Sequence, residues 1–80
     1  MTPSTDISLD EPVLITTSSG QTYRAAVEQG VVEISYEDHE RWLWAGEGTW
    51  DGTGIAECNA DLGEDGIELL NAAISKAIAE

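Results

Sequence analysis

The first chemistry to consider lies in the run Glu37-Asp38-His39-Glu40, where several side chains that can bind metal stand together. Carboxylates with one imidazole can hold a divalent ion. Consecutive residues of a strand or tight turn, however, point in different directions. His39 is the only histidine, so motifs that need two histidines are excluded, and the spacing of a calcium-binding loop is absent. We therefore interpret the run as a charged turn and expect no metal site.

Nucleophilic catalysis would have to combine Cys58 with His39, because a thiol needs a base to become reactive. Glu57 and Asp61 lie close to Cys58 in the sequence, and their negative charge disfavours a thiolate. Pairs of carboxylates are so abundant in this chain that no pair stands out as an acid and base. We expect no catalytic residue, and we expect that the protein is not an enzyme.

Two short glycine patterns, Gly46-x-Gly48 and Gly52-x-Gly54, resemble phosphate-binding loops only superficially. Neither has the glycine spacing of a nucleotide-binding loop, and neither follows a strand and opens a helix. Glu47 and Asp51 lie within these patterns and would repel a phosphate. The patterns therefore indicate turns, and we expect no cofactor.

The charge of the chain limits its partners more than any motif does. Sixteen acidic residues and three basic ones give a formal net charge of −13. Arg24, Arg41 and Lys76 cannot form a basic patch, so direct binding to DNA, RNA or an anionic membrane is excluded. Three explanations of the acidity stay open: solubility, adaptation to high salt, and a partner with a basic surface.

The length of 80 residues predicts one small domain with a modest core. Residues 1–12 are polar and contain both prolines, which predicts a flexible N-terminal tail before a single domain at residues 13–80. The single cysteine fits a reducing compartment, and neither a signal peptide nor a membrane-spanning apolar run is visible. We therefore expect a cytoplasmic protein.

The last part of the chain, Gly63 to Glu80, has the clearest helical pattern. Ile67, Leu70, Ile74 and Ile78 recur at spacings of three and four residues, so they fall on one stripe of a helix. A helix of this length is marginally stable alone in water. Its apolar stripe must therefore pack on the preceding part of the chain.

That preceding part alternates between apolar and polar residues, as strands do. Gln29-Gly30 is typical of a two-residue hairpin turn, and Gly46 to Gly54 is expected to be irregular. The sequence predicts class α+β, an antiparallel meander of four to five strands with one C-terminal helix packed on one face. The predicted strands are Val13–Thr17, Gln21–Glu28, Val31–Glu37, Arg41–Ala45 and Ile55–Cys58, with Thr49–Asp51 as a short returning strand.

The three tryptophans allow two interpretations. If the helix covers the sheet face that carries Trp42 and Trp44, these side chains belong to the core. If it covers the other face, they form an exposed aromatic patch beside Glu40 and Glu47, which is typical of an interface. One helix cannot cover both faces, and we expect Trp50 to be the exposed aromatic of this region.

The acidic side chains come from strands and turns that are neighbours in a meander. An array of carboxylates on one surface would speed association with a basic groove, and salt would weaken the attraction. The candidate partner-binding residues are Glu28, Glu33, Glu37, Asp38, Glu40, Glu47, Trp50 and Asp51.

Small size, strands followed by one helix, a single cysteine, and acids such as Glu28, Glu33, Glu37 and Asp38 resemble a known class of proteins. The class is that of small acidic phage-encoded inhibitors of host defence, which includes anti-CRISPR and other DNA-mimic proteins. The resemblance covers composition and expected architecture over residues 13–80 and rests on no shared motif, so it transfers no functional residue.

The resemblance implies a non-enzymatic binding protein in the host cell cytoplasm. Its acids would take the place of phosphates on a basic, nucleic-acid-binding surface of a CRISPR effector or restriction nuclease, and DNA binding would be blocked. The alternative is a small structural or regulatory domain of a salt-adapted cell or virus, in which the acids maintain hydration and mimic no nucleic acid. Stability in low salt distinguishes the two.

Overall fold

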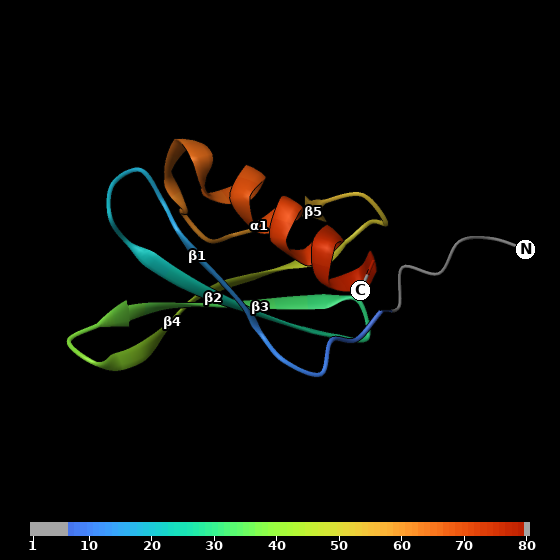
Figure 1. The fold of residues 1–80 in the computed structure, drawn as a ribbon, viewed down its shortest axis with the longest axis horizontal. Coiled ribbons are helices and arrows are strands. Elements are labelled where there is room, and N and C mark those ends of the chain that lie inside the picture. The colour runs from blue at the N-terminus through green and yellow to red at the C-terminus, as the bar shows by residue number, and fades with distance from the viewer. Residues whose placement is uncertain (1–6, 80) are drawn as a thin grey trace, which may run out of the picture.

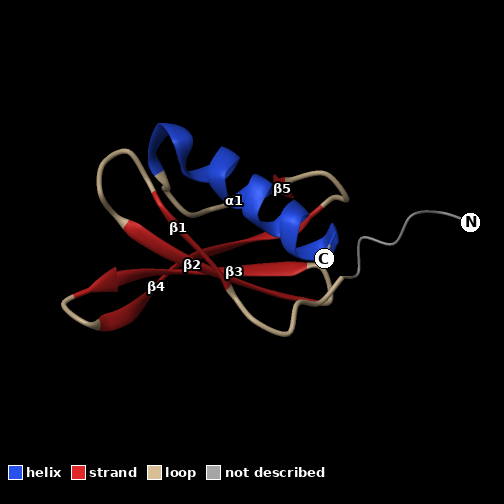
Figure 2. Cartoon of the chain, viewed as in Figure 1, coloured by secondary structure: helices blue, strands red, loops and turns tan. Residues whose placement is uncertain are grey.

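A five-stranded antiparallel sheet and one helix packed on it make up the structure, a computed structural model that describes residues 7–79 (Figures 1 and 2). The strands follow one another across the sheet in chain order. This arrangement confirms the predicted α+β meander with a C-terminal helix. The elements are β1 (Val13–Thr16), β2 (Thr22–Glu28), β3 (Val31–Asp38), β4 (Arg41–Trp50), β5 (Ile55–Ala56) and α1 (Gly63–Ala79).

Two tight turns fix the register of the three central strands. Gln29 and Gly30 connect β2 to β3 with φ angles of 51° and 78°, which confirms the predicted two-residue turn. His39 and Glu40 connect β3 to β4 with φ angles of 50° and 68°. Positive φ at both central residues suits the twist of a hairpin. The register that follows decides which side chains share a face.

The core lies between α1 and one face of the sheet, here called the inner face. Alternation along β2 and β3 places Ala25, Val27, Val32 and Ile34 on the inner face, where α1 covers them. The apolar stripe predicted for the helix is confirmed at its centre, although Ile78 is exposed. The fully assembled core comprises Ile15, Ala25, Val27, Val32, Ile34, Trp50, Leu62, Leu70 and Ile74.

β4 runs unbroken for ten residues, whereas the sequence predicted a strand that ends at Ala45 and a separate short strand after the glycines. That prediction is wrong, because the chain passes Gly46 with a β-bulge instead of a bend. Ser35 pairs with Trp44 and its neighbour Ile34 pairs with Gly46, so Ala45 is an extra residue in β4. A bulge of this kind shifts the alternation of the strand by one residue.

The bulge sends the tryptophans of β4 to opposite faces. Trp42 and Trp44 precede it and pair with Glu37 and Ser35, which places them on the outer face of the sheet, opposite to the buried Val32 and Ile34. Trp50 follows it and lies on the inner face, where only 4% of its surface is exposed. The expectation that Trp50 would be the exposed aromatic is therefore wrong, and so is the interpretation of Trp42 and Trp44 as core. Trp44 is the exposed one, at 58%.

Glycines after the bulge let the chain beyond β5 lie close against β4. A methyl group on Gly48 would stand 2.7 Å from Ile55 Cγ2 and 3.2 Å from Cys58 Cα. Beside it, the Glu47 amide donates to Asn59 Oδ1 over 2.8 Å, and the Asn59 amide donates to the Glu47 carbonyl over 3.0 Å. This segment continues the edge that the two residues of β5 begin.

Residues 7–12 are part of the fold, so the predicted tail does not extend to Pro12. The Leu9 amide donates to the Val27 carbonyl over 2.9 Å, and the Gly30 amide donates to the Ile7 carbonyl over 2.8 Å. Ile7 and Leu9 also pack against the core. The remainder of the predicted tail, residues 1–6, lies outside the described residues.

One side chain caps the start of α1, and two side chains of the helix fasten it to the β1–β2 loop and to β5. Asp61 Oδ1 accepts from the Gly63 amide over 3.2 Å at the start of the helix. Asp65 accepts from the amide of Ser18 over 3.0 Å and from its hydroxyl over 3.3 Å, which joins the first turn of α1 to the β1–β2 loop. Asn71 Oδ1 accepts from the Ile55 amide over 2.8 Å. These contacts fix α1 over the inner face alone.

The close packing at Gly48 predicts a large effect of a single methyl group. Gly48→Ala is expected to lower the free energy of unfolding by about 1–3 kcal/mol, because β5 or the segment after it must move to admit the methyl. Urea unfolding followed by circular dichroism measures the change. Ser35→Ala on the outer face is the control and should change stability by less than about 0.5 kcal/mol. Equal stability of Gly48→Ala and the unchanged protein would contradict the packing described.

Candidate interaction face

The outer face of the sheet, here called the open face, is left uncovered by α1, which lies on the inner side only (Figure 1). Large apolar side chains are exposed on it, with Leu14 at 60% and Trp44 at 58%. Soluble surfaces carry single exposed apolar residues routinely, but several on one flat face suggest a contact area. The register assigns to the open face Leu14, Thr16, Thr22, Arg24, Ala26, Glu28, Val31, Glu33, Ser35, Glu37, Trp42, Trp44, Glu47 and Thr49.

One row of the open face crosses four strands from one apolar side chain to another. Leu14 pairs with Arg24, Arg24 with Ser35, and Ser35 with Trp44. Arg24 reaches over the neighbouring tryptophan, Trp42, with its Cζ atom 4.6 Å from the ring centroid. This distance is typical of a cation–π contact. The row therefore has an aromatic end, a cation in the middle and an aliphatic end.

Carboxylates surround the aromatic end of that row. Glu33 and Glu37 stand two residues to either side of Ser35 on β3, and so diagonally across from Trp44. Glu33 also pairs directly with Glu47 of β4. Like charges directly opposite one another destabilise a sheet. The open face thus combines exposed aromatic surface with carboxylates that repel one another when no partner is bound.

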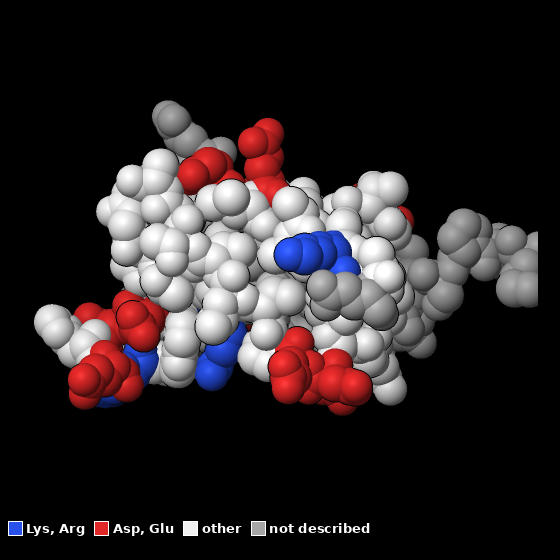
Figure 3. All heavy atoms as spheres, in the orientation of Figure 1, with Lys and Arg blue, Asp and Glu red and all other residues white. Residues whose placement is uncertain are grey.

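The predicted partner-binding residues divide into three groups. Glu28, Glu33, Glu37 and Glu47 lie together on the open face, as expected for neighbouring strands of a meander. Asp38 and Glu40 lie at the end of the β3–β4 hairpin, where acidic side chains gather in Figure 3. Trp50 belongs to the core, and Asp51 belongs to the loop after β4.

The carboxylate of Asp51 is engaged by its own loop. Its Oδ1 accepts from the amides of Thr53 and Gly54 over 2.9 and 2.8 Å, and from the Thr53 hydroxyl over 3.1 Å. These bonds stabilise the charged form, so the Thr53 amide above all, then the Gly54 amide, lower the pKa of Asp51 below its usual value of 3.8. Asp51 therefore shapes the β4–β5 loop.

The run of potential metal ligands forms an exposed turn. His39 Nε2 lies 3.6 Å from Asp38 Oδ1, and the His39 side chain is 93% exposed. Among the side chains of residues 7–63 and 65–79, no three His, Cys, Asp or Glu converge as metal ligands would. His39 is at the tip of the β3–β4 hairpin, whereas Cys58 follows β5 and lies against Gly48, which pairs with Val32 at the other end of that hairpin. The two do not form a nucleophile and base.

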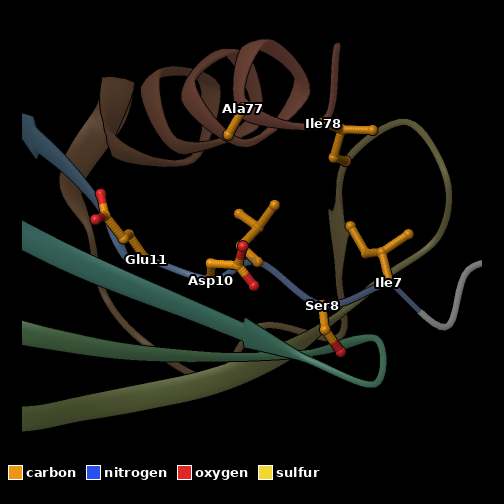
Figure 4. Close-up of a pocket in the computed structure, with 7 residues that line it drawn as sticks. Ile7, Ser8, Asp10, Glu11, Ala77 and Ile78 are labelled. Carbon is orange, nitrogen blue, oxygen red and sulfur yellow. The ribbon is translucent and has the colours of Figure 1, made fainter. Parts of the chain in front are cut away.

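A groove of about 630 Å³ runs between the end of α1 and the segment before β1 (Figure 4). Ala77 and Ile78 line its helix side, and residues 7–11 line the other. Ile7 and Ile78 contribute apolar surface, whereas Asp10 and Glu11 contribute exposed carboxylates. The groove holds no convergent set of polar groups of the kind that orients a small ligand.

Leu14, Arg24 and Trp44 lie on the open face and were not among the predicted site residues. The signal for Trp44 was present in the sequence. A two-residue turn at His39-Glu40 pairs Glu37 with Trp42, and an outward Glu37 therefore implies an outward Trp42 and Trp44. The stacking of Arg24 on Trp42 had no such signal, because the two residues belong to strands that are not adjacent.

Comparison of the chain with known protein families, with curated proteins and with solved structures finds no match. Within residues 7–79, no helix is both long enough and apolar enough to cross a membrane.

The faces assigned to the tryptophans predict opposite effects of two equivalent substitutions. Trp50→Ala is expected to lower the free energy of unfolding by about 3–5 kcal/mol, because it empties a core position. Trp44→Ala removes a mostly exposed side chain and should cost less than about 1 kcal/mol. Chemical unfolding followed by far-ultraviolet circular dichroism measures both changes independently of tryptophan fluorescence. A larger loss of stability for Trp44→Ala than for Trp50→Ala would contradict the faces assigned to the two side chains.

The bonds to Asp51 predict an acid-sensitive loop. Because its folded pKa is lowered, the stabilisation from the charged carboxylate is complete above pH 3.8 and is lost as the pH falls through the lowered pKa. An NMR titration of the Asp51 carboxyl carbon should have its midpoint below 3.8. Thr53→Ala removes the hydroxyl donor and should raise that midpoint, whereas Thr22→Ala should leave it unchanged. A midpoint at or above 3.8 in the unchanged protein would refute the assignment.

Proposed function

We propose that the chain is a non-enzymatic binding protein whose open face docks on a basic, nucleic-acid-binding surface of a partner protein. The partner class that fits best is an effector or nuclease whose DNA site would be blocked, as by a phage-type inhibitor of a CRISPR or restriction system acting in the host cytoplasm. The observation that carries the proposal is the exposed Trp44 between Glu33 and Glu37 on an uncovered sheet face.

The composition of the open face supports a protein partner. Trp44 and Leu14 would bury apolar and aromatic area on contact, and aromatic anchors provide much of the binding energy in protein interfaces. Arg24 is the only basic residue that the register places on this face, and it already lies over Trp42. A polyanion would meet four glutamates there, whereas a basic surface would be attracted.

The spacing of the acids supports a partner that normally binds a phosphate backbone. Glu33 and Glu37 are four residues apart on one strand, which corresponds to about 13 Å along β3. Glu28 and Glu47 extend the array onto the two neighbouring strands. Lysine and arginine side chains that contact successive phosphates could reach carboxylates spread in this way.

The proposal predicts a partner that both DNA and salt displace. The tagged chain, incubated with a bacterial lysate that contains CRISPR effectors and restriction nucleases, should retain a nucleic-acid-binding protein in low salt. Added DNA should release it, because DNA and the chain would bind the same basic groups of the partner. Rising salt should also release it, because salt screens the attraction between opposite charges. Mass spectrometry identifies what is retained, and the purified partner then gives a dissociation constant.

Charge reversal maps the surface with a matched control. Glu33→Lys with Glu37→Lys should weaken binding by at least about tenfold, since each change replaces an attraction by a repulsion across the interface. Glu11→Lys with Glu68→Lys changes the net charge by the same amount at exposed positions off the open face, and it should have little effect. Retention of no basic partner, together with unfolding in low salt and stabilisation in molar KCl, would replace the proposal by salt adaptation.

A further inference from the structure

The two tryptophans of the open face differ in their contact with a cation: Trp42 already carries one and Trp44 does not. The guanidinium of Arg24 lies over the ring of Trp42, and within residues 7–79 this is the one cation–π contact. Trp44 lies two residues further along the same strand and face, and it is 58% exposed. The chain thus displays an occupied and an unoccupied version of the same aromatic platform.

The surroundings of Trp44 suit a guanidinium better than they suit other groups. Its cross-strand partner Ser35 is short, and 58% of the Trp44 surface is exposed. Glu33 and Glu37 stand on either side of Ser35 on β3. A planar guanidinium can stack on an indole while its edge N–H groups donate to carboxylates. An ammonium group is more strongly hydrated and cannot stack in this way.

We propose that Trp44 is the docking position for an arginine side chain of the partner, with Glu33 and Glu37 accepting hydrogen bonds from its guanidinium. This inference rests on the function proposed above and names the residue type that the partner presents. Arg24 on Trp42 shows the contact within the chain itself, at 4.6 Å. Because Arg24 already covers the ring of Trp42, Trp42 is not available as a second docking position.

Other occupants fit the open face less well. A second copy of the chain would bring a further net charge of −13, and it would place one row of glutamates against another. An apolar segment without a cation would leave Glu33 and Glu37 partly desolvated and unpaired, which is unfavourable. A basic protein surface with an arginine in its centre meets both the aromatic ring and the acids.

The test uses an arginine peptide and a lysine peptide of equal length and charge, titrated against the full chain. The arginine peptide is expected to bind about two- to fivefold more tightly, which corresponds to one exposed cation–π contact. Trp44→Leu should remove this preference while general attraction to both peptides remains. Arg24→Gln should increase the preference, because it frees Trp42 as a second platform. Circular dichroism checks that each variant is folded.

Two further variants distinguish the contribution of the carboxylates to binding from that of the Trp44 ring. Glu33→Gln with Glu37→Gln should weaken binding of the arginine peptide more than Glu11→Gln with Glu68→Gln, which removes the same charge away from the open face. A preference for arginine that survives Trp44→Leu, or no preference at all, would overturn the docking position. The proposed function would still stand in that case if Glu33→Lys with Glu37→Lys released the captured partner. Absence of any basic partner would overturn the function itself.

Discussion

The extra residue at Ala45 is the constraint on which the rest of the structure depends. Trp42, Trp44 and Trp50 all occupy even positions of β4, so an uninterrupted strand would present all three on one face. The bulge between Trp44 and Gly46 shifts the alternation and gives the core one tryptophan and the open face two. A core built without phenylalanine gains its largest side chain in this way, while the same strand keeps aromatic surface available outside.

The bulge also determines what can pack beside it. Gly46 and Gly48 turn toward the inner face after the shift, and there they admit the segment from Ile55 to Ala60. Asn59 then bonds to both backbone groups of Glu47, and Asn71 holds β5 to the helix. These contacts hold β5 and the segment after it against α1 on the inner face, so α1 packs on that face alone. The open face remains uncovered as a direct result.

The open face combines features that oppose stability with features that favour binding. Glu33 and Glu47 stand opposite each other although their charges repel, and Leu14 and Trp44 expose apolar surface to water. Among residues 7–63 and 65–79 the single ion pair is the exposed one between His39 and Asp38, so the acids of this face form no ion pair with the chain's own lysine or arginines. A basic partner would relieve both the repulsion and the exposure. The two effects would act at the same residues, which is why we propose contact with a partner and not hydration alone.

The sequence alone determined the class of fold and the direction of most side chains. Alternation in β2 and β3, the glycine turn at Gln29-Gly30 and the helical stripe around Leu70 are local patterns, and each was read correctly from neighbouring residues. The net charge likewise followed from composition, and the predicted alternation of the strands placed four of the acids on one face. The tertiary structure decided which face the helix covers and which tryptophan is buried. A bulge depends on what packs against the strand from residues 55–60, and the contact of Arg24 with Trp42 crosses an intervening strand. Neither is encoded in a local pattern, because both arise only when distant segments meet.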